Sequence, residues 1–428
     1  MQKTPFILLA MFAFFANTAK GQLTLEQCHE RARQNYPLLN RYDLVHQTRD
    51  YTITNLRKGY LPKLTLGAQA TYQSDVATLP ETLTGMLEQM GEDFNGLKRD
   101  QYKIEIEASQ VIYDGGNIKT RSEMAAREAD VQIARTDVDM YNLRDRVNQL
   151  FFGILLLDEQ LRLNEELQTL LNSNRTKMEA WQRSGTAMES DVAAISAELL
   201  NAQQQHTQLT AGRESFTHML SIFIGHRGTL PTLLKPSADE PQSLENQRPE
   251  LQLFDARLRH ADSQMKNLNA GLRPGVNLFA RGWYGYPGLD MFADMRSRNW
   301  SLNGIIGIKL SWNISHLYTY KGDKAKIALS QNIIENEREV FLFNNSLRTV
   351  QTHAAIGQYR EMMQRDDEIV RLRTTVRKAA EAKLAGGIID TDLLLREITA
   401  EHKACIDRAI HEVEMLRNIY NLRHEINQ

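Results

Sequence analysis

The chain has 428 residues, a formal net charge of −2 and a mean hydropathy of −0.45. The near balance of charge argues against nucleic acid as a partner, because nucleic-acid-binding domains usually carry a basic surface. No internal run approaches the roughly 20 apolar residues of a membrane-spanning helix, which excludes a helical membrane protein.

The N-terminus, residues 1–21, is typical of a secretory signal peptide. Lys3 precedes an apolar run from Phe6 to Ala16, and the small residue Gly21 follows near the expected cleavage point. These features predict an exported protein. The alternative is that the segment is a short buried helix.

The chain has only two cysteines, Cys28 and Cys405, near its opposite ends. Two cysteines in an exported protein do not make a disulfide scaffold. The residues before Cys28 do not form a lipobox, so we predict a buried helix residue rather than a lipidated N-terminus.

Four segments alternate apolar and polar residues with the period of a β-strand, at about 62–73, 101–112, 275–286 and 300–312. Each is about as long as a tilted barrel strand that crosses a bilayer, roughly 9–11 residues. Half-buried strands of a soluble protein alternate too, so an ordinary soluble sheet or sandwich is the alternative interpretation. The charged residues at polar positions are Lys63, Lys103, Glu105, Glu107, Arg281 and Lys309.

The remaining sequence has helical periodicity. Asn117 to Arg183 contains no proline and a single glycine, Gly153, which predicts one helix roughly 100 Å long. Apolar residues at steps of four and three form two coiled-coil seams. The first is Leu143, Val147, Leu150, Ile154, Leu157 and Leu161, and the second is Ile406, Ile410, Val413, Leu416 and Tyr420.

The chain reads as two repeats, 22–225 and 248–428, joined by a proline-containing linker, 226–247. Arg183–Asp191 aligns with Leu384–Asp392 at a spacing of 201 residues. Each repeat is expected to contain a helix, a strand, a loop, a strand, a very long helix, a turn and a long helix.

Four strands are too few for a membrane barrel, since even the smallest barrels need about eight. Open strand edges are not tolerated in lipid, because their backbone N–H and C=O groups would lack partners. We therefore expect other copies of the chain to complete the barrel, with the apolar face toward lipid and the polar face toward a water-filled lumen.

The motifs LTLEQC (Leu23–Cys28), YLPKL (Tyr60–Leu64) and VIYDGG (Val111–Gly116), the Gly185 turn and their second-repeat counterparts resemble those of the TolC-like outer membrane efflux proteins. This family supplies the outer membrane factor of tripartite efflux and secretion systems. The resemblance covers the whole mature chain. It implies a mainly α fold with a transmembrane β-barrel portion: a long α-helical coiled-coil tunnel and four β-strands per protomer, with a trimer forming a twelve-stranded barrel.

The resemblance also implies a homotrimer in the outer membrane of a Gram-negative bacterium, with its helices extending into the periplasm. Its partners would be outer membrane lipid, a periplasmic adaptor (membrane fusion) protein and an inner-membrane pump of the RND, ABC or MFS class.

The residues themselves offer no catalytic constellation. The eleven histidines are scattered, and paired Cys/His spacings are missing from the sequence. Asp114-Gly115-Gly116 lacks the lysine of a phosphate loop, so we interpret it as the turn from a strand into a helix. We expect neither enzymatic activity nor a cofactor or metal.

The resemblance places a periplasmic gate after the second helix–helix turn. Asp392 takes the position of an acidic constriction residue, with Asp390 beside it, whereas Leu395 stands where the family has a further acid. Asp390 as a plain helix N-cap is the alternative. The resemblance also implies adaptor-docking tips at Gly185, Thr186, Ala187, Gly386, Gly387 and Ile388, although glycine is expected at any helix-hairpin turn.

The function expected is therefore a passive outer membrane channel of a tripartite efflux or type I secretion system, conducting substrates from the pump and adaptor to the outside. The alternative is a soluble periplasmic coiled-coil protein with a structural or adaptor role. The sequence leaves open the cargo (drug, metal ion or protein), the pump class, the resting state of the gate and the conformation of loop 74–101.

Overall fold

The computed structural model describes residues 22–91, 94, 96–241 and 243–427, so the predicted signal peptide lies outside the described residues. Contacts divide the chain into two compact units. The first contains the chain up to Asn40, Thr136–Pro249 and the chain from Val340; the second contains Arg41–Arg135 and Glu250–Glu339. Each unit combines segments from both predicted repeats.

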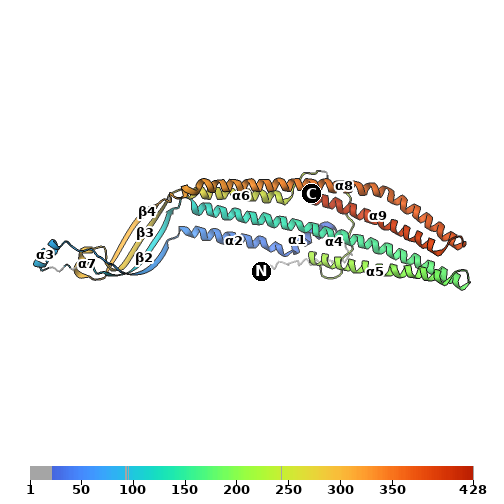
Figure 1. Ribbon diagram of the computed structural model, residues 1–428, viewed down its shortest axis with the longest axis horizontal. Coiled ribbons are helices and arrows are strands. Elements are labelled where there is room, and N and C mark those ends of the chain that lie inside the picture. The colour runs from blue at the N-terminus through green and yellow to red at the C-terminus, as the bar shows by residue number, and fades with distance from the viewer. Residues whose placement is uncertain (1–21, 92–93, 95, 242, 428) are drawn as a thin grey trace, which may run out of the picture. The chain divides into compact units, whose positions relative to one another are not determined.

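Helices and strands follow one another in the predicted order (Figure 1). The first half contains α1 (Leu25–Asn35), the 3-10 turn η1 (Pro37–Leu39), α2 (Asn40–Arg57), the 3-10 turn η2 (Lys58–Tyr60), β1 (Lys63–Tyr72), α3 (Glu81–Gln89), β2 (Asp100–Tyr113), α4 (Asn117–Arg183) and α5 (Glu189–Ile224). The second half contains α6 (Pro249–Ala270), β3 (Gly275–Tyr286), α7 (Met291–Ser297), β4 (Ser301–Ser311), α8 (His316–Ala385) and α9 (Thr391–Ile426).

Two of these helices are very long. The 67 residues of α4 and the 70 residues of α8 each correspond to about 100 Å of helix. Within the described residues, none of the helices combines the length and the apolar character needed to cross a membrane. The short helices α3 and α7 lie inside strand–strand loops and were not expected from the sequence.

The second unit holds a four-stranded antiparallel sheet in the order β1-β2-β3-β4. Three of its strands are labelled side by side in Figure 1. Within the described residues, β1 and β4 each pair on one side only, so both edges of the sheet are open.

The two strand–strand loops pack against each other around a small core. Leu97, Tyr286 and Met295 are its buried residues. The backbone N–H of Lys98 donates to the Tyr286 hydroxyl at 2.9 Å, and the N–H of Gly288 donates to the Asp294 carboxylate at 2.5 Å. The described part of loop 74–101 is therefore fixed against the β3–β4 loop, which the sequence did not predict.

Polar contacts join α6 to the parts of α4 and α8 that belong to the second unit. Lys266 Nζ lies 2.7 Å from Glu123 Oε1, and the Tyr320 hydroxyl donates to Asn269 Oδ1 at 2.8 Å. Exposed pairs of this kind contribute roughly 0–1 kcal/mol each. These contacts therefore add little to the free energy of unfolding, and their main effect is on how the helices are oriented.

The first unit has an apolar core between α1, α4, α5 and α9. The predicted seam of α4 contributes Val147 and Ile154, which are 0% and 1% exposed, and the seam of α9 contributes Leu416. Cys28 is fully buried in α1, as predicted. Burial raises the pKa of the Cys28 thiol to about 12, so this group is an inert part of the core.

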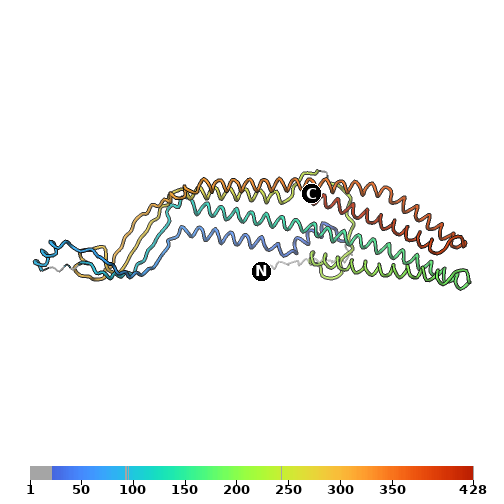
Figure 2. The backbone as a smooth tube through the Cα atoms, in the orientation of Figure 1, coloured from blue at the N-terminus to red at the C-terminus, as the bar shows by residue number. Residues whose placement is uncertain are grey.

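Each long helical hairpin, α4–α5 and α8–α9, ends in a tight turn (Figure 2), and each turn contains a glycine with positive φ. Gly185 and Gly387 have φ of 76° and 70°, a left-handed conformation that favours glycine. The N–H of Thr186 donates to the Trp181 carbonyl and that of Ile388 to the Lys383 carbonyl, each at 2.9 Å, which defines a Schellman motif at each turn. The predicted alignment at a spacing of 201 is therefore wrong by one residue, because Gly387, not Gly386, takes the left-handed position of Gly185.

Candidate functional site: the amphipathic sheet and the helix tips

The charged strand residues predicted to line a lumen share one face of the sheet. Directly paired residues of neighbouring strands point to the same side, as do alternate residues of one strand. The pairs Lys63–Ser109, Glu107–Arg281 and Asn277–Lys309 therefore connect this face across all four strands. The residues brought together are Lys63, Lys103, Glu105, Glu107, Arg281 and Lys309.

Ion pairs neutralise both acids on this polar face. Lys103 Nζ lies 2.9 Å from Glu105 Oε2, and Arg281 Nη2 lies 2.7 Å from Glu107 Oε2. Arg281 Nε donates to the same oxygen at 3.1 Å. Each acid is thus held by a base of the same chain, which the strand pattern alone did not indicate.

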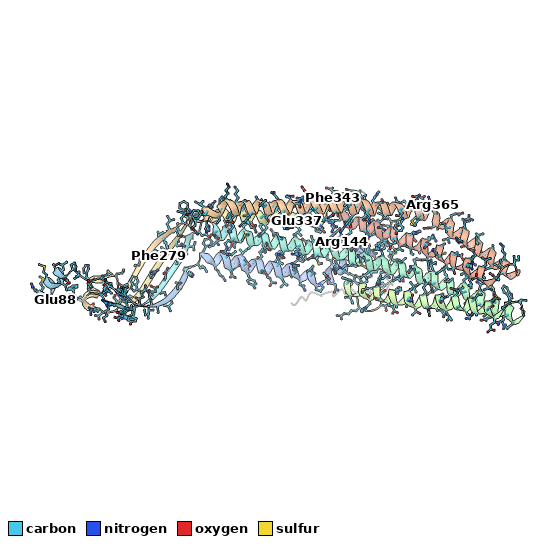
Figure 3. The ribbon with its side chains drawn as sticks, in the orientation of Figure 1. Glu88, Arg144, Phe279, Glu337, Phe343 and Arg365 are labelled. Atoms are coloured by element: carbon cyan, nitrogen blue, oxygen red, sulfur yellow. The ribbon has the colours of Figure 1, made fainter. Side chains whose placement is uncertain are left out.

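Two aromatic residues interrupt the polar face. Phe279 pairs with Gly307 of β4, and its ring lies 3.0 Å from where a Cβ of residue 307 would be. Glycine at 307 therefore leaves the space that the ring occupies. Trp283 pairs with Glu105 on the other side of Arg281. Figure 3 labels Phe279 on β3.

The opposite face is apolar and exposed. Leu66, Ile306 and Ile308 are 76%, 75% and 74% exposed, although each is a large aliphatic residue. Soluble monomeric proteins rarely expose contiguous apolar patches of this extent. The exposed aliphatic residues of this face are Leu64, Leu66, Ile104, Ile106, Leu278, Leu302, Ile306, Ile308 and Leu310.

Exposed aromatic residues flank this apolar face at both ends. Trp300 and Trp312 border β4, and the Trp300 ring lies 5.4 Å from the ring of Tyr284. The two tryptophans are twelve positions apart, which corresponds to about 40 Å along the strand. At a barrel tilt of roughly 40° the separation along the membrane normal is about 30 Å, close to the thickness of a hydrocarbon core.

The two acids at the second hairpin turn have different environments. Asp390 is the N-cap of α9, and its Oδ1 accepts from the Leu393 backbone N–H at 2.9 Å. Asp392 is exposed in the first turn, with Oδ2 2.8 Å from Arg396 Nη2. Leu395 packs against the core near the turn, where a carboxylate would be desolvated. The N-cap interpretation of Asp390 is confirmed, and the gate role of Asp392 stays a prediction.

A hydrogen bond ties the two hairpin tips together. Thr391 is 4% exposed, and its Oγ1 donates to Asp191 Oδ1 at 2.9 Å. The other carboxylate oxygen of Asp191 accepts from the Met188 backbone N–H at 2.9 Å, which caps α5. No sequence signal predicted this tie, because the two residues are 200 positions apart.

Five of the six predicted docking residues are exposed at the tips: Gly185, Thr186, Gly386, Gly387 and Ile388. The sixth, Ala187, is half-buried and packs against the core near the turns. The tips thus present backbone and small side chains, together with two large apolar side chains, Met188 and Ile388, which are both 73% exposed. Docking of an adaptor there stays a prediction.

Comparison with known proteins agrees with this geometry. Residues 29–216 match the sequence model of the outer membrane efflux protein family. The fold is similar to that of VceC from Vibrio cholerae, with a TM-score of 0.68 and 14% identity over 94% of this chain and 95% of that one. It is also similar to CmeC from Campylobacter jejuni, with a TM-score of 0.67 and 13% identity over 94% and 85% of the two chains.

A third similar structure is the MtrE outer membrane channel of Neisseria gonorrhoeae, with a TM-score of 0.65 and 13% identity over 94% of this chain and 88% of that one. A comparison with curated proteins gave no match.

The fold is thus that of outer membrane channels, mainly α-helical with four strands per chain, as predicted. Residues 29–216 are thus similar in sequence to outer membrane efflux proteins, and the fold of the chain agrees with that similarity. The resemblance seen in the motifs and the predicted outer membrane location are confirmed by this match.

Proposed function

We propose that this chain is the passive outer membrane channel of a tripartite efflux or type I secretion system. The observation that carries the proposal is a sheet with one exposed apolar face and two open edges. In lipid, each unpaired backbone group at such an edge would cost several kcal/mol. Neighbouring copies would pair with β1 and β4 and close a barrel, with its apolar face toward lipid.

An uncovered helical seam supports assembly from several copies. Val340, Phe343, Leu347 and Val350 follow one another on α8 at steps of three, four and three, and are 51%, 65%, 54% and 69% exposed. This spacing is that of a coiled-coil seam, which is stable when another helix covers it. A helix of a neighbouring copy is the natural cover. Figure 3 labels Phe343 on α8.

Three copies satisfy both requirements. Three sheets of four strands make twelve strands, above the minimum of about eight for a membrane barrel. The long helices would then surround a periplasmic tunnel, and the tips at Gly185 and Gly387 would contact an adaptor. Energy would come from an inner-membrane pump, so the channel itself needs no catalytic group.

A soluble periplasmic coiled-coil protein is the competing function. It accounts for the long helices, but it leaves the exposed apolar face and its aromatic borders without a role. The channel accounts for both, since aliphatic bands between aromatic girdles are typical of outer membrane barrels.

Cell fractionation separates the two functions. We expect the full-length protein to sediment with the outer membrane, to require detergent for release, and to form ion-conducting pores after reconstitution into planar bilayers. Release by osmotic shock without detergent would favour the soluble protein. Crosslinking in cells, followed by identification of co-purified proteins, would then reveal the adaptor and the pump.

A further inference from the structure

The polar face of the sheet carries a net positive charge once its ion pairs are counted. Its six charged residues are four bases and two acids, which gives +2 per chain (4 − 2). The strands contain one more charged residue, Asp100, at the loop end of β2. It alternates with the polar-face residues of β2 and therefore belongs to the opposite face.

The two uncompensated bases are Lys63 and Lys309. Both side chains belong to exposed residues, and within the described part of the chain neither has an ion-pair partner. Lys103 and Arg281, by contrast, are engaged with Glu105 and Glu107. The excess charge is thus localised on two residues rather than spread over the face.

These two lysines lie on opposite edges of the sheet, two residues apart in register, because Lys63 is in line with Gly307 of β4. Lys63 is the first residue of β1, three positions after the η2 turn ends, and Lys309 lies two residues before the end of β4, which leads into α8. At about 3.3 Å per residue, both lie within about 7 Å of the helix-side ends of their strands. When copies pair through their open edges, Lys309 of one copy and Lys63 of the next border the same junction.

We propose that Lys63 and Lys309 of three copies form a ring of six positive charges at the helix-side end of the barrel lumen, which selects for anionic solutes. This inference rests on the proposed function, because it needs the assembled trimer. The solutes favoured would carry carboxylate, sulfonate or phosphate groups. A ring of like charges in a confined pore raises the local concentration of counter-ions and lowers that of co-ions.

The test compares ion selectivity between variants of the reconstituted channel. The double variant Lys63→Gln/Lys309→Gln removes the ring and keeps similar side-chain length. The matched control, Glu107→Gln/Arg281→Gln, removes one acid and one base from the same face without changing its net charge. All are made in an Asp392→Asn background, so that the predicted anionic gate does not mask the lumen.

Reversal potentials are measured in a KCl gradient with the lower side near 10 mM, where the Debye length is about 30 Å and screening is weak. We expect the chloride-to-potassium permeability ratio to fall at least threefold in the lysine double variant and to stay within a factor of 1.5 of the parent in the control. Tripolyphosphate added from the helix side should block the parent at a concentration at least tenfold lower than it blocks the lysine variant.

The failures of the two proposals are distinguishable. Trimers that conduct normally, with the same permeability ratio and the same tripolyphosphate block in parent and lysine variant, would overturn the lysine ring and leave the channel intact. A parent protein that forms no trimer and no pore would overturn the proposed function itself. An equal shift in the charge-neutral control would show that pore geometry, not the lysine ring, sets selectivity.

Discussion

His424, near the end of α9, is half-buried, and its imidazole lies close to arginines. Its ring stacks on Tyr141 with centroids 4.4 Å apart, and its Nδ1 is buried without a hydrogen-bond partner among the described residues. Burial, followed by the charges of Arg248 and Arg144, lowers the pKa of His424 from 6.5 to about 3. The native protein therefore keeps this imidazole neutral in mild acid, while the unfolded chain binds a proton there.

The first prediction is a loss of stability below pH 6.5. Because the unfolded state alone is protonated in this range, the free energy of unfolding should fall by about 1.4 kcal/mol per pH unit, or about 2 kcal/mol at pH 5. His424→Phe keeps an aromatic stack and should reduce the drop in thermal midpoint between pH 7 and pH 5. His29, whose pKa burial also lowers, leaves part of the slope in place.

The control for this prediction is His353→Phe, which changes an exposed histidine of α8. Its midpoint should drop between pH 7 and pH 5 as much as that of the parent. An equal drop in the parent and in His424→Phe would mean that His424 is not linked to acid stability.

A second prediction concerns Asp392. Three symmetry-related copies would place three carboxylates in one ring, which attracts divalent cations. Asp392→Asn should therefore raise the divalent-ion concentration needed to block single-channel current from the periplasmic side. Asp390→Asn is the control, because asparagine is an equally good N-cap and should leave the block unchanged. Identical curves for parent and Asp392→Asn would reduce Asp392 to a surface residue paired with Arg396.

The strands form the clearest functional element, since one face of their sheet is aliphatic and the other carries six charged residues. A third prediction tests those faces. Ile306→Arg places a charge on the apolar face near mid-bilayer and should cost about 2–4 kcal/mol per copy, seen as reduced trimer yield or thermal stability. Glu105→Arg lies on the polar face and should mainly change ion selectivity. Equal damage to assembly by the two substitutions would mean that the faces are assigned wrongly.

We expect the whole protein to assemble as a homotrimer. A fourth prediction tests the uncovered seam of α8. Native mass measurement in detergent should give a trimer, and Phe343→Asp should weaken it, because the carboxylate would be buried between helices. Asn344→Asp is the control: it adds the same charge at an exposed neighbouring position, about 100° away around the helix. A well-folded monomer of the parent protein would exclude the trimer.

Local patterns predicted much of this architecture. The period-two alternation around Leu66 and Ile306 located strands and their faces, and the apolar seam through Val147 and Ile154 located buried helix positions. The exposed seam at Phe343 has the same spacing and could have been found in the same way. The helices α3 and α7 were missed because short loop helices carry too few turns for a clear periodicity.

The position of a residue along a strand or helix sets the direction of its side chain. The sequence by itself therefore determined which faces are polar, apolar or seam-forming. Tertiary structure alone decided the partners of those faces. Glu107 pairs with Arg281 across 174 positions, and Thr391 bonds Asp191 across 200. It also decided that Gly387 carries the second turn and that Lys63 and Lys309 keep uncompensated charge. Such pairings arise only when segments distant in the chain are brought into contact, and local periodicity carries no information about them.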